Sequence, residues 1–153
     1  MINALVKLIF TCLILGLAQF ANAQLLDEIE INPVAGGAEV NIRFASQIQY
    51  LRHYPKDKGD KIQVYFRLLA LDTPEPLQAQ EQRKSPPSDL LPSFTVSYSP
   101  RGSCDAASSN HCVVIQFSRP VQYKIKPGKD AYSVTLQVTA LSSPETTQPK
   151  SEK

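Results

Sequence analysis

Apolar and polar side chains alternate along much of the chain after residue 24. The stretches "AEVNIRF" (38–44), "IQVYFRLL" (62–69), "CVVIQF" (112–117) and "AYSVTLQV" (131–138) all carry an apolar residue at every second position. A period of two is typical of β-strands that bury one face. Beyond Ala23, a helical period appears only weakly, around positions 77–83. The pattern therefore predicts an all-β protein.

The alternating pattern occurs twice. Val40, Ile42 and Phe44 recur at one constant shift as Val113, Ile115 and Phe117. The apolar residues of 62–68 recur at a slightly smaller shift, as Tyr132, Val134, Leu136 and Val138. Because the apolar positions are kept while the polar ones vary, we interpret the chain as a duplicated unit of three to four strands.

The turn residues divide each copy into strands. In the first copy the expected strands are 27–32, 38–44, 48–54 and 62–69, with turns at Gly36–Gly37 and at 56–61, where Gly59 can supply a positive φ. The second copy gives 93–99, 112–117, 121–125 and 131–138. Neither copy can cover its own apolar face, so two small sheets stacked as a β-sandwich are expected. An open barrel of the same strands is the alternative.

The domain organisation follows from this interpretation. Residues 24–141 form the sandwich, with the first half at 25–71 and the second at 93–141. The connection 72–92 holds five of the twelve prolines and few large apolar residues, and we expect it to be mobile. The polar stretch 142–153 is expected to be a disordered tail.

The N-terminal segment 1–23 resembles a secretory signal peptide. Lys7 precedes an apolar run at 8–17, and Ala21 and Ala23 stand at the small-residue positions of a cleavage site after Ala23. An uncleaved anchor is the alternative, but a spanning helix needs about 20 apolar residues. We therefore expect export, no stable membrane span after cleavage, and residence in the periplasm of a bacterium with an outer membrane.

Cleavage would remove Lys7 from the 16 basic side chains and none of the 14 acidic ones, so the mature chain is close to neutral. Such a balance gives no electrostatic reason to bind nucleic acid. Two cysteines remain, Cys104 and Cys112, and an even number in an exported chain indicates a disulfide. A metal site built from both cysteines and His111 is the alternative, although zinc usually requires four ligands.

Residues for catalysis are not gathered in any recognisable motif. The sequence has no nucleophile elbow, no glycine-rich phosphate loop before a helix, and only two histidines, His53 and His111. Asp60 and Asp130 recur at equivalent places in the two copies, which turn chemistry explains. We expect neither an enzyme nor a cofactor or metal.

The second copy resembles the AMIN domain, a module of periplasmic peptidoglycan amidases and of type IV pilus secretins. The resemblance rests on "VVIQFS" (113–118), Pro120–Val121, Asp130 and the final strand 132–138. The first copy follows the pattern less well, with Gln47–Ile48 in place of Pro120–Val121. The resemblance implies a non-catalytic targeting module. The catalytic or secretin domain that usually follows is missing from this sequence.

The outward positions of the strands supply candidate binding residues. Arg43, Arg52, Tyr65 and Arg67 are expected on one solvent face, with Lys124 adding positive charge. Arginine pairs with carboxylates by two parallel hydrogen bonds, and tyrosine can lie against a sugar ring. This favours attachment to peptidoglycan or the cell envelope. The alternative is an adaptor that binds another envelope protein, for example of a pilus or secretion system, through a sheet edge.

Overall fold

The computed structural model describes residues 24–69, 80–99, 104 and 110–139, and these residues contain eight strands and no helix. The strands are β1 (Leu26–Val34), β2 (Gly37–Phe44), β3 (Ile48–Tyr54), β4 (Lys58–Leu68), β5 (Glu81–Lys84), β6 (Phe94–Ser99), β7 (His111–Pro127) and β8 (Ser133–Thr139). The all-β prediction is confirmed. The expected signal peptide (1–23) and the expected tail (142–153) lie outside the described residues.

All eight strands belong to one antiparallel sheet. Its main order is β1-β2-β8-β7-β4-β3, and β6 and β5 branch from β7, with β6 pairing β7 and β5 pairing β6. The hydrogen-bond ladders are continuous through β7, so the strands do not separate into the two hydrogen-bonded sheets expected from the sequence.

The long strand β7 makes this continuity possible. Its first part pairs with β6 up to Phe117, and from Gln122 onward it pairs with β8. Pro120 lies between these two ladders, at a position that no ladder uses. Proline has no N–H to donate, and it is tolerated where a strand has no partner. Two expected strands, 112–117 and 121–125, are therefore one element.

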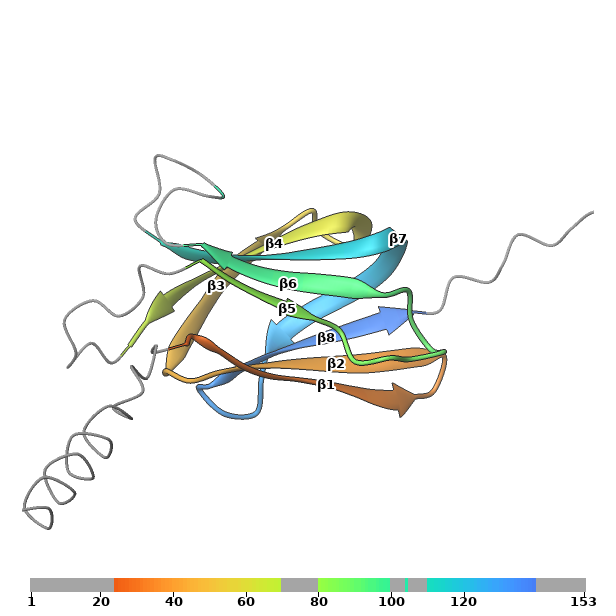
Figure 1. The fold of residues 1–153 in the computed structure, drawn as a ribbon, viewed down its shortest axis with the longest axis horizontal. Coiled ribbons are helices and arrows are strands. Elements are labelled where there is room, and N and C mark those ends of the chain that lie inside the picture. The colour runs from red at the N-terminus through yellow and green to blue at the C-terminus, as the bar shows by residue number, and fades with distance from the viewer. Residues whose placement is uncertain (1–23, 70–79, 100–103, 105–109, 140–153) are drawn as a thin grey trace, which may run out of the picture.

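The sheet has two arms that meet in β7 (Figure 1). We call the strands β1, β2, β8 and the C-terminal part of β7 (122–127) the first arm. The second arm consists of β3, β4, the N-terminal part of β7 (111–117), β6 and β5. In the view of Figure 1 the strands β4 and β6 of the second arm lie above β1 and β2 of the first arm.

The two copies of the repeat interleave between these arms. Val40 of β2 pairs with Leu136 of β8, and its equivalent Val113 pairs with Val64 of β4. The register thus makes Val64 the counterpart of Leu136, whereas the sequence pattern matched it with Val134. Each arm holds strands from both copies, because β2 joins β8 and β4 joins β7. Periodicity reveals which residues face inward but not which strands become neighbours.

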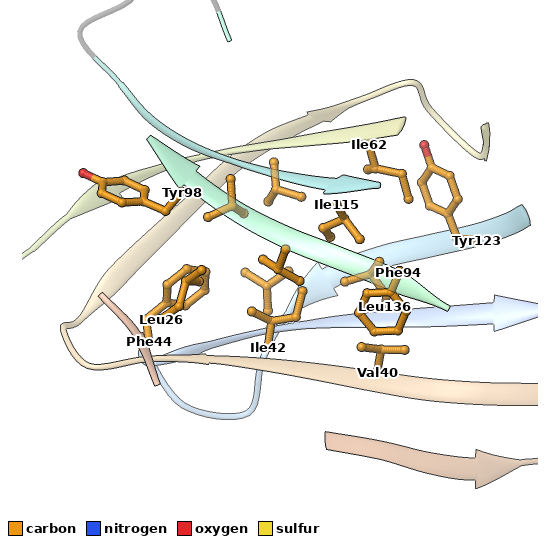
Figure 2. Close-up of a cluster of buried hydrophobic side chains, with 14 of the residues drawn as sticks. Leu26, Val40, Ile42, Phe44, Ile62, Phe94, Tyr98, Ile115, Tyr123 and Leu136 are labelled. Atoms are coloured by element: carbon orange, nitrogen blue, oxygen red, sulfur yellow. The ribbon is translucent and has the colours of Figure 1, made fainter. Parts of the chain in front are cut away.

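The core contains the inward residues of both arms (Figure 2). Phe44 of β2 and Phe66 of β4 are 1% and 0% exposed, and their ring centroids lie 5.1 Å apart. This aromatic contact joins the first arm to the second. Most of the predicted inward positions are confirmed, and the following are buried: Val40, Ile42, Phe44, Ile62, Val64, Phe66, Leu68, Phe94, Val96, Tyr98, Val113, Ile115, Phe117, Val134, Leu136 and Val138. Ile29, Ile31 and Tyr132 are only partly buried.

Two turn predictions have different outcomes. Gly36 has a φ of 80° and lies in the turn between β1 and β2, as expected. Gly59, by contrast, lies inside β4, which begins at Lys58. Asp60 is therefore at an irregularity within a strand, between Gly59 and Lys61, whereas Asp130 is in the turn before β8, so the two aspartates are not equivalent.

The connection between the copies is more ordered than expected in its second part. Residues 81–84 form β5, and Leu91 is 7% exposed in the core. The Glu81 carboxylate accepts hydrogen bonds from the backbone N–H groups of Leu25 and Leu26, at 2.5 and 2.8 Å. These contacts attach the start of β1 to β5. The prediction of a mobile connection is wrong for residues 81–84, and residues 72–79 lie outside the described part.

Tyr123 attaches β7 to the loop after β3. Its ring is buried and its hydroxyl donates a 2.7 Å hydrogen bond to the Pro55 carbonyl oxygen. Burial, with a smaller contribution from the Asp57 charge, raises the pKa of Tyr123 to about 12. The phenol therefore stays protonated near neutral pH and keeps this hydrogen bond to the Pro55 carbonyl oxygen.

Candidate functional surface

The five predicted binding residues do not share one face. Arg43 on β2 and Lys124 on β7 point outward from the first arm, because their neighbours Ile42 and Tyr123 are buried. Arg52, Tyr65 and Arg67 belong to β3 and β4 of the second arm. The predicted single face therefore divides into two groups. The reason is that the copies exchange strands between the arms.

Arg43 is engaged by neighbouring carboxylates. Its guanidinium lies 2.9 Å from Asp130 and 3.8 Å from Asp27, and it is 5.9 Å from the Tyr132 ring. Asp130 also accepts hydrogen bonds from the Ser133 hydroxyl at 2.7 Å and the Tyr132 N–H at 3.0 Å. Arg43 thus stabilises the turn before β8, and a ligand carboxylate would have to compete with Asp130.

The Asp130 turn gives the fold an expected pH dependence. The Ser133 hydroxyl, followed by the Tyr132 N–H and Arg43, lowers the pKa of Asp130 below its ordinary value. A lowered pKa in the folded state contributes stability that is present above the ordinary value and lost as pH falls through the lowered one. We expect Asp130→Asn to reduce the free energy of unfolding at neutral pH, and the gap from wild type to shrink in acid.

Denaturant unfolding of both proteins over a pH series measures this gap. Asp89→Asn, which removes an exposed carboxylate in the segment before β6, is the matched control for the loss of one negative charge. A gap for Asp130→Asn that stays constant or grows as pH falls would contradict the assigned role.

Arg52 covers Tyr65 on the second arm. The two residues are paired across β3 and β4, and the guanidinium carbon lies 4.4 Å from the ring centroid. Tyr65 is only 5% exposed, and its hydroxyl donates a 3.3 Å hydrogen bond to the Gln63 side chain. The ring cannot therefore stack against a sugar in this conformation. Instead, a cation–π contact holds the Arg52 guanidinium over the sheet.

The ladder-paired outward positions of the second arm carry positive charge only, and the exposed Asp60, which no ladder pairs, adjoins Lys61 in β4. Paired residues point to the same side of a sheet, and the ladders place the outward residues of β3 to β7 in adjacent rows. We call this surface the cationic face. It carries Arg52, Lys61, Arg67 and Lys84, together with Gln49, Tyr54, Gln63, Tyr65, Gln82, Thr95, Ser97, Cys112, Val114 and Gln116. None of these described positions is Asp or Glu.

Lys84 of β5, in the connection expected to be mobile, was not predicted for this face, and two residues of β3 and β4 were also missed. Tyr54 is 68% exposed and pairs with Gln63, so it offers an accessible aromatic ring at the β3 edge. The ring of Tyr65, which is 5% exposed, is not accessible in this way. Lys61 pairs with Gln116 and is exposed. Alternation predicts an outward position for both residues, because Tyr54 lies two positions after Arg52 and Lys61 lies two positions before Gln63. Lys61 was not among the predicted binding residues, because the turn expected at 56–61 included it.

The outward surface of the first arm is mixed in charge. Lys126 lies 3.7 Å from Glu39, and Glu39 also accepts a 3.4 Å hydrogen bond from the Gln137 amide. Lys124 is exposed and pairs with Gln137, which pairs in turn with Glu39 in the same row. Opposite charges in the same row or in adjacent rows largely neutralise each other. The first arm therefore has no concentration of positive charge comparable to the cationic face.

The predicted pair Cys104 and Cys112 forms a disulfide, with the Cα atoms 6.2 Å apart. Cys112 pairs with Tyr65 in the ladder between β4 and β7, so the disulfide adjoins the cationic face. Residues 105–109 within its loop lie outside the described part. In the described residues no three metal-ligating side chains gather in one place.

Both histidines bond to tyrosines. His53 Nδ1 lies 2.5 Å from the Tyr50 hydroxyl and Nε2 lies 2.7 Å from the Lys56 carbonyl oxygen. His111 Nδ1 lies 3.0 Å from the Tyr98 hydroxyl, and its ring stacks on Phe66. A general base must reach the nucleophile whose proton it removes, and in these contacts the partners are phenols. The observed roles are structural.

Comparisons with family models, with curated proteins and with solved structures found no match to this chain. The described residues contain no helix that is long and apolar enough to span a membrane.

Proposed function

We propose that this protein is an exported, non-catalytic binding module that attaches to peptidoglycan in the periplasm through its cationic face. The observation that carries the proposal is the absence of carboxylates from the described ladder-paired positions of that face, which combines Arg52, Lys61 and Arg67 with the exposed ring of Tyr54. We further propose that the two arms act as the layers of a β-sandwich, as in the AMIN domain that the second copy resembles.

The chemistry of the face suits this polymer. Peptidoglycan offers carboxylates on its stem peptides and sugar rings along its glycan strands. Guanidinium groups bind carboxylates by charge-assisted hydrogen bonds, each contributing about 1.5–3 kcal/mol. The glutamine side chains at positions 49 and 63 can both donate to and accept from sugar hydroxyls. The Gln116 amide already donates to the Asp60 and Phe117 carbonyl oxygens, so its side-chain oxygen remains as an acceptor. Tyr54 can lie against a ring at the β3 edge.

Pelleting with purified sacculi tests the proposal. We expect the mature protein to sediment with sacculi, and Arg52→Ala combined with Arg67→Ala to weaken binding about tenfold or more, from the loss of charged hydrogen bonds. Lys124→Ala combined with Lys126→Ala removes the same charge from the first arm and should bind as wild type. Equal loss in both double variants, or no pelleting of wild type, would contradict the proposal.

An adaptor for another envelope protein is the second candidate. Its support is the exposed apolar character of the β3 edge, where Leu51 is 36% and Tyr54 is 68% exposed. Edge strands can accept a strand from a partner. If affinity capture from an envelope extract free of wall fragments recovers a specific protein, and Leu51→Lys abolishes its recovery, the adaptor function is favoured over wall attachment.

A further inference from the structure

The branched sheet has three edge strands, the four-residue β5 and the two longer strands β1 and β3. In the described part of the chain, no strand pairs with the outer side of β1 or β3. The Glu81 contacts cover only the start of β1, at Leu25 and Leu26. An edge strand presents unpaired N–H and C=O groups that another strand can use. Both of these longer edges thus retain backbone capacity for pairing.

The two longer edges carry opposite charge. β1 contains Asp27, Glu28 and Glu30 and no Lys or Arg. Asp27 is 3.8 Å from Arg43, whereas Glu28 and Glu30 are exposed and make no ion pair with another described residue. β3 contains Arg52 and no Asp or Glu. Lys56 and Lys58 follow it, with Asp57 between them.

The order of charges along the edges suits antiparallel pairing. The acidic residues occupy the first half of β1, whereas Arg52 and the following lysines stand at the end of β3. If β1 runs antiparallel to β3, its acidic first half meets this basic end. Every ladder in the sheet is already antiparallel, and the strands have comparable lengths of nine and seven residues. Two β1 edges paired in this way would set the acidic first half of each strand against the uncharged second half of the other, with no opposite charge to meet.

We propose that copies of this protein associate head to tail, with β1 of one copy added to β3 of the next. The occupant of each edge is a second copy of the chain, chosen by the charge complementarity between Glu28 and Glu30 on one side and Arg52 on the other. The contact joins two different surfaces, so it forms a chain or ring of copies rather than a two-fold dimer. This inference is independent of wall binding.

Sedimentation velocity on the mature protein tests the association. We expect the average mass to rise with protein concentration at low salt and to fall at high salt, because charge pairs at a surface are screened. Arg52→Glu, and separately Glu28→Lys with Glu30→Lys, should each weaken association about tenfold or more. A wild-type protein that stays monomeric at high concentration and low salt overturns the proposal.

Mixing the two variants provides the decisive experiment. Each variant alone has edges of equal sign, but the basic β1 of one complements the acidic β3 of the other. Association should therefore return in the mixture, and a monomeric mixture of folded variants overturns the proposal. Lys124→Glu makes the same charge change as Arg52→Glu on the first arm and should associate normally. Circular dichroism establishes that each variant is folded.

The outcome also separates this contact from the proposed wall binding. The variant with Glu28→Lys and Glu30→Lys leaves the cationic face intact, so it should still pellet with sacculi while failing to associate with itself. Loss of self-association with retained pelleting supports both proposals. Retained self-association in that variant overturns the edge contact alone.

Discussion

Replacement of Phe66 by Ala should lower the free energy of unfolding by about 3–5 kcal/mol, the range observed for large aromatic residues truncated in cores. Phe66 is fully buried on β4 and touches Phe44 of β2 and the His111 ring of β7, with centroid distances of 5.1 and 5.8 Å. The substitution removes apolar contact area and leaves a cavity where the two arms meet. Denaturant unfolding followed by circular dichroism measures the loss.

Two further variants make this result specific. Phe66→Leu keeps most of the volume and should cost clearly less than Phe66→Ala. Leu69→Ala changes a side chain that is 53% exposed and lies just beyond the end of β4, and we expect a change within about 0.5 kcal/mol. If Phe66→Ala destabilised the protein no more than Leu69→Ala, the result would contradict the buried contact between Phe66 of β4 and Phe44 of β2.

Removal of the disulfide should lower the free energy of unfolding by about 2.5 kcal/mol, from the chain entropy released when this short loop is opened in the unfolded state. Cys104 and Cys112 are eight residues apart, and Cys112 is 5% exposed at the start of β7. The double variant Cys104→Ala with Cys112→Ala separates the effect of the bond from that of free thiols. Denaturant unfolding again gives the measurement.

Wild-type protein treated with a dithiol reductant is the matched comparison. It should unfold at nearly the same denaturant concentration as the double variant, because both lack the cross-link. The reductant should have no effect on the double variant itself. A double variant as stable as oxidised wild type would show that the disulfide adds nothing to the fold.

The two largest effects differ in how far the sequence anticipated them. The disulfide followed from counting cysteines after the expected signal peptide, and Phe66 was assigned to the core from its period of two. The contact between Phe66 and Phe44 was not predictable in the same way. It depends on β8 and β7, which come from the other copy of the repeat and pair with β2 and β4 respectively.

The candidate binding surface was predicted only in part. Alternation correctly placed Arg43, Arg52, Arg67 and Lys124 away from the core. It also placed Tyr65 outward, but it could not show that Arg52 covers the ring and leaves it almost inaccessible. The separation of Arg43 from Arg52 likewise depends on which arm each strand joins.

The sequence by itself determined the all-β class, the repeated pattern and most of the inward residues, because alternation is a local property that each strand displays in its own residues. Only the tertiary structure decided that β7 joins the arms, that the copies exchange strands, and that four cations gather on a face whose described ladder-paired positions hold no carboxylate. Those features depend on pairing between residues far apart in the chain. A period of two is compatible with many different strand pairings. The pairing adopted is the one that buries the apolar faces of all the strands together.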